Sequence, residues 1–256
     1  MSHLQRIGPD MLRIASQTIH RHDGSTVAAE VLARLQIGQT ELSPPSFMHG
    51  RSAEEWSSLD QVVMAMVMST PSLHAGNKPT FVNVSAGTLE NDQHMHSFCR
   101  AVERHTDQRS QQLVIEIPES SPLKGKRLVA RLRDIELAGA QVAIDDFGSE
   151  HAAQERLEAY AWHYCKVDLG AVQEHDNLDW LDRAIRYAER EGIQLVMEKL
   201  ECLKDMEVLL PVRYRAWFQG YSFSRPKTLE IPAGAVRNAR AAPQLSLVQR
   251  AAVRAG

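Results

Sequence analysis

Short apolar runs that end in an acidic or amide side chain recur along this chain. The runs are rich in β-branched residues, as buried strands are, and five of them share the pattern: Phe81–Asn83, Leu113–Glu116, Val142–Asp146, Val167–Asp168 and Leu195–Glu198. A carboxylate that closes a buried strand is costly to remove from water. Several carboxylates that meet at one end of a sheet therefore need a shared cationic partner, and the simplest such partner is a metal ion.

Segments with helical periodicity separate these runs. Apolar residues recur at helical spacing over Leu128–Ile135 and Leu178–Ile185, and Gly192 follows the second segment as a helix stop. Strands that alternate with helices predict βα units and a parallel sheet. Polar residues come about one βα unit apart from Asn83 to Gln219, and a (β/α)8 barrel carries its chemistry at the carboxyl ends of its strands. We therefore predict an α/β fold, a single-domain TIM-like (β/α)8 barrel, in preference to an open sheet.

Composition excludes several classes of protein. The 256 residues carry a net charge of -3, which argues against a surface built as a whole for nucleic acid. The N-terminus lacks the pattern of a secretory signal, and no stretch reaches the ~18 apolar residues of a membrane span. We expect a cytoplasmic protein with no membrane segment. The three cysteines are far apart, and the pairs His20/His22 and His94/His96 lack a third ligand, so a zinc site is not indicated.

The expected domain layout has three parts. Residues 1–13 form an N-terminal lead, residues 14–232 form the barrel, and residues 233–256 form an arginine-bearing tail. The tail is interpreted as a closing helix packed on the barrel, with a basic partner-binding or nucleic-acid-binding segment as the alternative. No sensory or receiver segment is recognised, so regulation is expected to act on the barrel, on its dimer interface or on its expression.

An all-oxygen set of side chains is the strongest chemical signal. It consists of Glu30, Asn83, Glu116, Asp145 and Asp146. Hard divalent cations such as Mg2+ or Mn2+ prefer oxygen ligands. Two such ions ~4 Å apart can activate a water and hold the leaving oxygen of a phosphoryl displacement. Acids at strand ends also cap helices, so spacing alone leaves both interpretations open.

Seven segments in order resemble the EAL-domain family of cyclic di-GMP phosphodiesterases. They are Glu30–Arg34, Phe81–Ser85, Glu116–Ser120, Asp145–Gly148, Lys166–Asp168, Glu198–Glu201 and Gln219–Pro226. The first resembles the family's Glu-Ala-Leu-x-Arg signature with Val31 in its second place, and the last closely resembles the family's QGYxFSxP ending. The resemblance spans residues 14–232.

The resemblance implies a barrel that binds cyclic di-GMP with two Mg2+ or Mn2+ ions, with Ca2+ inhibitory, and that opens the ring to linear pGpG. Metal ligands would be the all-oxygen set above. The resemblance further implies three groups of residues: Lys166, Glu198 and Asp146 in catalysis, Gln17, Leu32, Arg34 and Gln219 in substrate binding, and Glu119 and Glu201 in support of the loop after the sixth strand. Hydrolysis would lower the messenger and favour motility over biofilm. Family members commonly pair, so the resemblance includes a homodimer among the partners it implies, while the sequence leaves the oligomeric state open.

Departures from the family pattern leave an alternative open. The segment 149–154 departs from the family's loop, Lys199 stands where the family has glycine, Thr18 stands where it has proline, and Pro118 replaces a threonine. Every metal-ligand position stands, so a phosphodiesterase is favoured. The alternative is a weak or inactive barrel that senses cyclic di-GMP or binds a regulatory protein partner.

Overall fold

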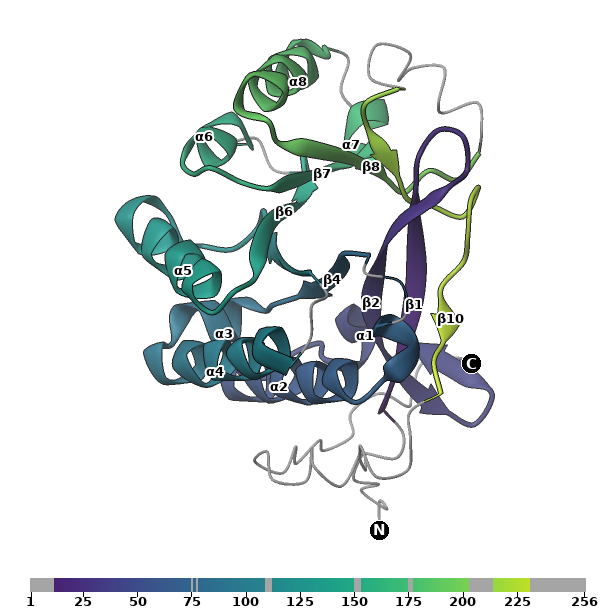
Figure 1. Ribbon diagram of the computed structural model, residues 1–256, viewed down its shortest axis with the longest axis vertical. Coiled ribbons are helices and arrows are strands. Elements are labelled where there is room, and N and C mark those ends of the chain that lie inside the picture. The colour runs from purple at the N-terminus through teal and green to yellow at the C-terminus, as the bar shows by residue number, and fades with distance from the viewer. Residues whose placement is uncertain are drawn as a thin grey trace.

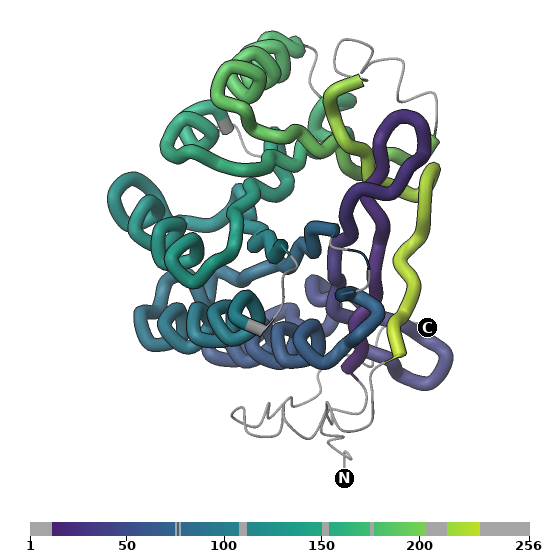
Figure 2. Tube along the Cα trace, in the orientation of Figure 1, coloured from purple at the N-terminus to yellow at the C-terminus, as the bar shows by residue number. Residues whose placement is uncertain are grey.

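The fold was analysed in a computed structural model that describes residues 12–74, 76, 78–108, 112–149, 153–174, 177–202 and 214–230. Figure 1 and Figure 2 show a ring of strands with helices on its outside. The predicted tail at 233–256 lies outside the described residues, as do residues 1–11 of the predicted lead. The proposed domain boundaries therefore stay predictions.

Eight strands close the barrel. In ring order, they are β1 (Leu12–His20), β2 (Thr26–Ile37), β4 (Thr80–Asn83), β5 (Leu113–Pro118), β6 (Gln141–Phe147), β7 (Tyr164–Asp168), β8 (Gln194–Glu198) and β9 (Trp217–Phe218). The ring closes where His20 of β1 pairs with Phe218 of β9. Two short strands, β3 (Thr40–Leu42) and β10 (Lys227–Thr228), add to the edges of β2 and β1. The predicted closed barrel is confirmed.

One strand runs against the predicted direction. β1 pairs antiparallel with both β2 and β9, whereas neighbouring strands from β2 through β4 to β9 pair parallel. The link between β1 and β2 is the turn 21–25, which is too short for the crossover helix that parallel strands require. Gly24 takes a φ of 82° in this turn, and the Asp23 carboxylate accepts a hydrogen bond from the Ser25 amide. The predicted parallel sheet therefore has an exception at β1, which is antiparallel to both of its neighbours in the ring.

Helices cover the outer face of the ring (Figure 1). Both helices foreseen from apolar periodicity are present, as α5 (Gly125–Leu137) and α8 (Asp179–Glu191), and Gly192 caps α8 with a φ of 73°. The remaining helical elements are α1 (Pro44–Phe47), α2 (Ala53–Met68), the 3-10 turn η1 (Pro71–His74), α3 (Ala86–Glu90), α4 (Asp92–Gln108), α6 (Ala153–Glu158) and α7 (Leu169–Glu174).

The barrel interior is built in two layers. Side chains alternate between the two faces of a strand, so residues two apart share a face. A small apolar cluster fills the lower layer: Ile19, Ala28, Phe81, Val114, Ala143, Tyr164 and Val196. The upper layer consists of polar residues. Each of them lies two positions after a member of the apolar cluster on the same strand, with Ile19 of β1 as the one cluster member that has no such follower: Glu30, Asn83, Glu116, Asp145, Lys166 and Glu198. The apolar plug thus supports a charged layer at the carboxyl ends of the strands.

Candidate functional site

Lys166 lies at the centre of the charged layer. Its ammonium is 2.7 Å from carboxylate oxygens of both Glu116 and Asp145, 3.1 Å from Glu198 and 3.2 Å from Glu30. The Lys166 side chain is 1% exposed, and the side chains of its partners are at most 12% exposed. Strands β2, β5, β6, β7 and β8 each contribute one member, because each places one residue in the inward register at this height.

Two amide side chains complete the hydrogen bonding of this layer. Asn83 Nδ2 donates to Glu30 Oε1 and to Glu116 Oε2, each at 2.8 Å. Gln219 Nε2 donates to Glu30 Oε2 at 2.6 Å and to Gln17 Oε1 at 3.3 Å. Glu30 thereby accepts from both amides and from Lys166, and its position and charge are the most constrained of the four carboxylates.

Burial and charge act in opposite directions on these groups. Burial opposes ionisation of Glu30, but the charge of Lys166 and the hydrogen bonds from Gln219 and Asn83 lower its pKa. Burial raises the pKa of Glu198 to about 8, although Lys166 opposes the shift. Burial and the neighbouring Glu30 carboxylate raise the pKa of Glu116 well above its ordinary value. The surroundings therefore favour the ionised form of Glu30 and oppose the ionised forms of Glu116 and Glu198.

The lysine itself remains cationic. Burial opposes its charged form, but the carboxylates of Asp145, Glu116, Glu198 and Glu30 raise the pKa of Lys166 well above its ordinary range. Burial also raises the pKa of Asp145 against the attraction of Lys166. A fixed positive charge next to protonatable carboxylates is suited to orienting and polarising a water or a phosphate oxygen.

A second ion cluster lies at the rim, beside the first. Asp146 follows Asp145 on β6, but its carboxylate accepts from the Lys199 ammonium at 2.8 Å instead of turning to Lys166. The same ammonium is 2.6 Å from Asp168, the last residue of β7. The Lys199 and Asp146 side chains are 52% and 45% exposed, so this cluster faces solvent.

Glu119 supports the loop that follows β6. Its Oε2 accepts from the amide of Gly148 at 3.0 Å and from the hydroxyl of Ser149 at 3.3 Å. Gly148 has a φ of 99° and packs against the Trp180 ring. Glu201, predicted to share this task, is exposed. Residues 150–152 of the divergent loop lie outside the described residues, and the last two positions of that segment begin α6.

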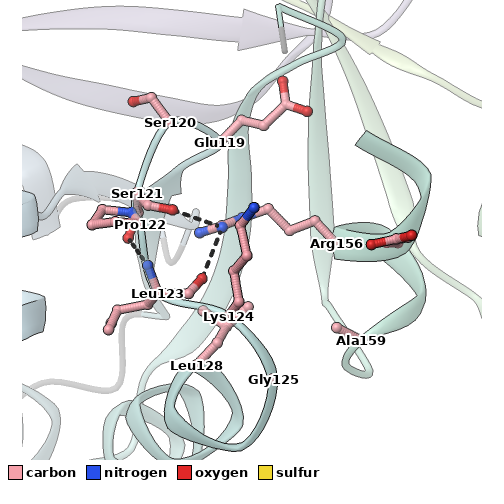
Figure 3. A pocket seen from close by; sticks show the side chains of 11 residues that line it. Glu119, Ser120, Ser121, Pro122, Leu123, Lys124, Gly125, Leu128, Arg156 and Ala159 are labelled. Atoms are coloured by element: carbon pink, nitrogen blue, oxygen red, sulfur yellow. Dashed lines mark hydrogen bonds between the residues drawn. The ribbon is translucent and has the colours of Figure 1, made fainter. Parts of the chain in front are cut away.

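A pocket of about 250 Å³ lies next to this loop (Figure 3). Arg156 of α6 reaches across it and donates to the backbone carbonyls of Ser121 at 3.1 Å, Leu123 at 3.2 Å and Pro118 at 3.2 Å. The guanidinium is buried, and burial lowers its pKa. Arg156 thus ties α6 to the segment that carries Glu119.

The predicted substrate-binding residues divide into two groups. Gln17 and Gln219 are buried beside Glu30, and Gln17 Nε2 also donates to the Ser224 carbonyl at 2.9 Å. Leu32 and Arg34 follow Glu30 on the same face of β2, further toward its carboxyl end, and both are half-buried. Arg34 is paired with Glu41 at 3.3 Å. Arg34 therefore lies outside the network around Lys166.

The oxygen-rich layer fits hard divalent cations by its chemistry. Among the described residues, no three Asp, Glu, His or Cys side chains are arranged around an open point suited to a metal, because four carboxylates converge on Lys166 instead. Glu198 Oε1 is nevertheless buried without a hydrogen-bond partner in the described part of the chain. A carboxylate oxygen in this state offers an available lone pair to a cation.

Sequence reasoning gave no role to two buried acidic residues. Asp168 was recognised as a strand-closing acid but was assigned no task; it is buried at the carboxyl end of β7 and accepts a hydrogen bond from Lys199. Asp60 of α2 is buried outside the barrel and accepts from the amide and the hydroxyl of Ser85 and from the hydroxyl of Thr88. The sequence signal for Asp60 was an acidic residue among the apolar residues of the segment that forms α2.

Comparison with known proteins gives a consistent match. A family model described as EAL domain matches residues 10–226. The curated protein "Probable cyclic di-GMP phosphodiesterase PdeN" of Escherichia coli K12 is 32% identical over 123 residues, which are 46% of this chain and 24% of that protein. The matched segment is therefore about a quarter of the relative's length.

Solved structures share the fold. The YkuI protein of Bacillus subtilis, with an EAL domain and in complex with cyclic di-GMP and calcium, has a TM-score of 0.75 at 20% identity, over 91% of this chain and 60% of that one. BlrP1 of Klebsiella pneumoniae, in a complex with manganese and cyclic di-GMP, has a TM-score of 0.70 at 22% identity, over 88% of this chain and 58% of that one.

In the described residues of this chain, no helix has both the length and the apolar character that crossing a membrane requires.

Proposed function

The chain belongs to the EAL domain family, and on that basis we propose that it hydrolyses cyclic di-GMP to linear pGpG at the charged layer of its barrel. The observation that carries the proposal is the buried Lys166 ammonium held among Glu30, Glu116, Asp145 and Glu198. Relatives named or solved with cyclic di-GMP support the choice of substrate. Hydrolysis adds one water at a phosphorus and breaks one ester bond, which opens the ring.

Divalent ions are part of the proposal. Glu30, Asn83, Glu116, Asp145 and Asp146 would hold two Mg2+ or Mn2+ ions, and Glu198 would complete the cluster. When bound, such ions polarise a phosphoryl oxygen and make a water more acidic. The complexes of relatives with calcium and with manganese support a divalent requirement. Calcium is expected to permit binding and to inhibit turnover.

The chain's own side chains then have distinct tasks. Lys166, whose charge is fixed by its surroundings, would orient the attacking water and stabilise the negative charge that develops on it. Gln17 and Gln219 would hydrogen-bond to the substrate next to Glu30. Leu32 and Arg34, further along β2, would contact the base or phosphate, with the forked guanidinium of Arg34 exchanging Glu41 for a phosphate. Glu119 would hold the loop after β6.

A second candidate function follows from the rim cluster. Lys199 pairs with Asp146, one of the proposed metal ligands. A barrel in which this pair persists would bind cyclic di-GMP without cleaving it and act as a sensor, or it would dock a regulatory protein. A homodimer and an effect on the balance of motility and biofilm remain predictions of the family resemblance, and a cytoplasmic location remains a prediction of the sequence composition.

Product formation tests the proposal. Purified protein is incubated with Mn2+ and cyclic di-GMP, and the nucleotides are separated by chromatography. We expect pGpG with the unmodified chain and with Lys126→Ala, which changes an exposed lysine of α5, and none with Glu30→Ala or Lys166→Ala. Absence of pGpG at high protein concentration would exclude hydrolysis. Calorimetry with cyclic di-GMP and Ca2+ then distinguishes a sensor, which binds the nucleotide, from a protein-docking module, which does not.

A further inference from the structure

The rim cluster consists of Lys199, Asp146 and Asp168. The two adjacent aspartates Asp145 and Asp146 pair with different lysines. The Asp145 carboxylate turns inward to Lys166, whose side chain is 1% exposed, and the Asp146 carboxylate turns to Lys199, whose side chain is 52% exposed. Each of the two proposed ligands on β6 therefore already has an ammonium partner. The inner ammonium is enclosed by carboxylates, whereas the outer one stands at the edge of the layer on a flexible four-carbon stem.

Lys199 is in contact with two carboxylates and not one. Its Nζ is 2.8 Å from Asp146 Oδ1 and 2.6 Å from Asp168 Oδ2. The other oxygen of Asp168 accepts from the Gly170 amide at 2.7 Å, which fixes the orientation of that carboxylate. Two oxygens from neighbouring strand ends are thus held on one cation. This is the arrangement that a hard divalent ion also favours.

The backbone on both sides of this ion pair is held in an uncommon conformation. Among the described residues, Asp146 at φ 54° and Lys199 at φ 60° are the two non-glycine residues with positive φ. A side chain costs free energy in this region of backbone space, and such residues persist where surrounding contacts hold them. Here both strained residues meet through their side chains, so the strain and the ion pair occur at one point of the rim.

From this geometry we infer that Lys199 is a tethered competitor of the outer divalent ion. An ion that binds Asp146 competes with the Lys199 ammonium, which is 2.8 Å from Asp146 Oδ1, while an ion in the inner layer does not. Lys199 therefore weakens binding at the outer position and leaves the inner position unchanged, so that the barrel responds to divalent-ion concentration. The inference rests on the proposed function only in its use of Asp146 as a metal ligand.

Manganese binding without nucleotide tests the inference. The protein is titrated with Mn2+, and free Mn2+ is measured by electron paramagnetic resonance, which gives the number of ions and their dissociation constants. We expect a tight and a weak site in the unmodified chain. In Lys199→Gly, which suits the positive φ, and in Lys199→Met, which keeps the length, the weak site should bind at least about tenfold more tightly. In Lys199→Arg, which keeps the charge, it should stay weak.

The result that would overturn the inference is a weak-site dissociation constant that is the same in all four proteins, or a second site that is absent from both neutral variants. Circular dichroism confirms that each variant is folded. The assay is independent of turnover. If both ions bind tightly to Lys199→Gly and no pGpG forms, the proposed hydrolysis fails and the inference about Lys199 stands.

Discussion

At the scale of single residues, Lys166 is the residue on which the charged layer depends. Four buried carboxylates share its ammonium. Removing one partner of a buried ion cluster leaves charge without compensation, which costs about 3–5 kcal/mol. We expect Lys166→Met in chelator-treated buffer to lower the free energy of unfolding by about this amount, measured by urea titration. The matched control Lys126→Met, at an exposed position, should change it little; equal loss in both variants would contradict the account.

Asp60 gives the protein a pH-dependent stability outside the barrel. Burial raises its pKa from 3.8 to about 6, although hydrogen bonds from Thr88 and Ser85 oppose the shift, as does the more weakly acting charge of His94. Because the folded state holds the proton more tightly than the unfolded state, the contribution of Asp60 to stability is present below about pH 4 and is lost as pH rises through about 6. The shift corresponds to about 3 kcal/mol.

Asp60→Asn should remove most of this dependence. Denaturant titrations at about pH 4.5 and about pH 7.5 should show the unmodified protein losing more stability than the variant as pH rises. The comparison between the two proteins cancels the contributions of other titrating groups. Parallel curves for the two proteins would show that Asp60 is not responsible.

At the scale of elements, Glu119 couples the β5 end to the loop after β6. Glu119→Ala removes the acceptor of the Gly148 amide and of the Ser149 hydroxyl. A buried donor left without its partner costs about 1–3 kcal/mol. We expect faster exchange of the Gly148 amide hydrogen in this variant, measured by mass spectrometry, and little change in Glu155→Ala, which alters an exposed acid of α6. Unchanged exchange in Glu119→Ala would contradict its supporting role.

The elements also show what a sequence can and cannot predict. The strand ends at Asn83 and Glu198 were foreseen, because an apolar run that closes on a polar residue depends only on local order, whereas β5 continues two residues past Glu116 to Pro118. The reversal of β1 was not foreseen, because it depends on the short turn 21–25 and on pairing with β9 at the other end of the chain. The α5 and α8 helices were foreseen from their apolar faces.

Within the site, long-range contacts are what the sequence leaves out. The resemblance indicated which residues cluster, and the structure brings Glu30, Asn83, Lys166 and Gln219 together. The resemblance could not indicate that Lys199 contacts Asp146 and Asp168, because these three residues come from separate βα units. Lys199 makes this contact from a backbone conformation with positive φ, which the pattern of apolar and polar residues in a sequence does not predict.

At the scale of the whole molecule, the barrel is a closed ring of strands with an apolar plug below and a charged layer above. This division predicts that nucleotide binding stabilises the molecule as one unit. A ligand that binds only the folded state at about 100 times its dissociation constant adds about 2.7 kcal/mol. With Ca2+, cyclic di-GMP should raise the melting temperature of the unmodified chain and not that of Glu30→Ala. An identical rise in both proteins would place the nucleotide outside the charged layer.

The most direct test of the central claim is the fate of cyclic di-GMP itself. A time course with saturating Mn2+, resolved by chromatography, follows substrate and product together. We expect cyclic di-GMP to be converted into an equal amount of linear pGpG by the unmodified protein and to stay intact with Lys166→Ala. Cyclic di-GMP that stays intact with the unmodified protein, or equal conversion by Lys166→Ala, would contradict it.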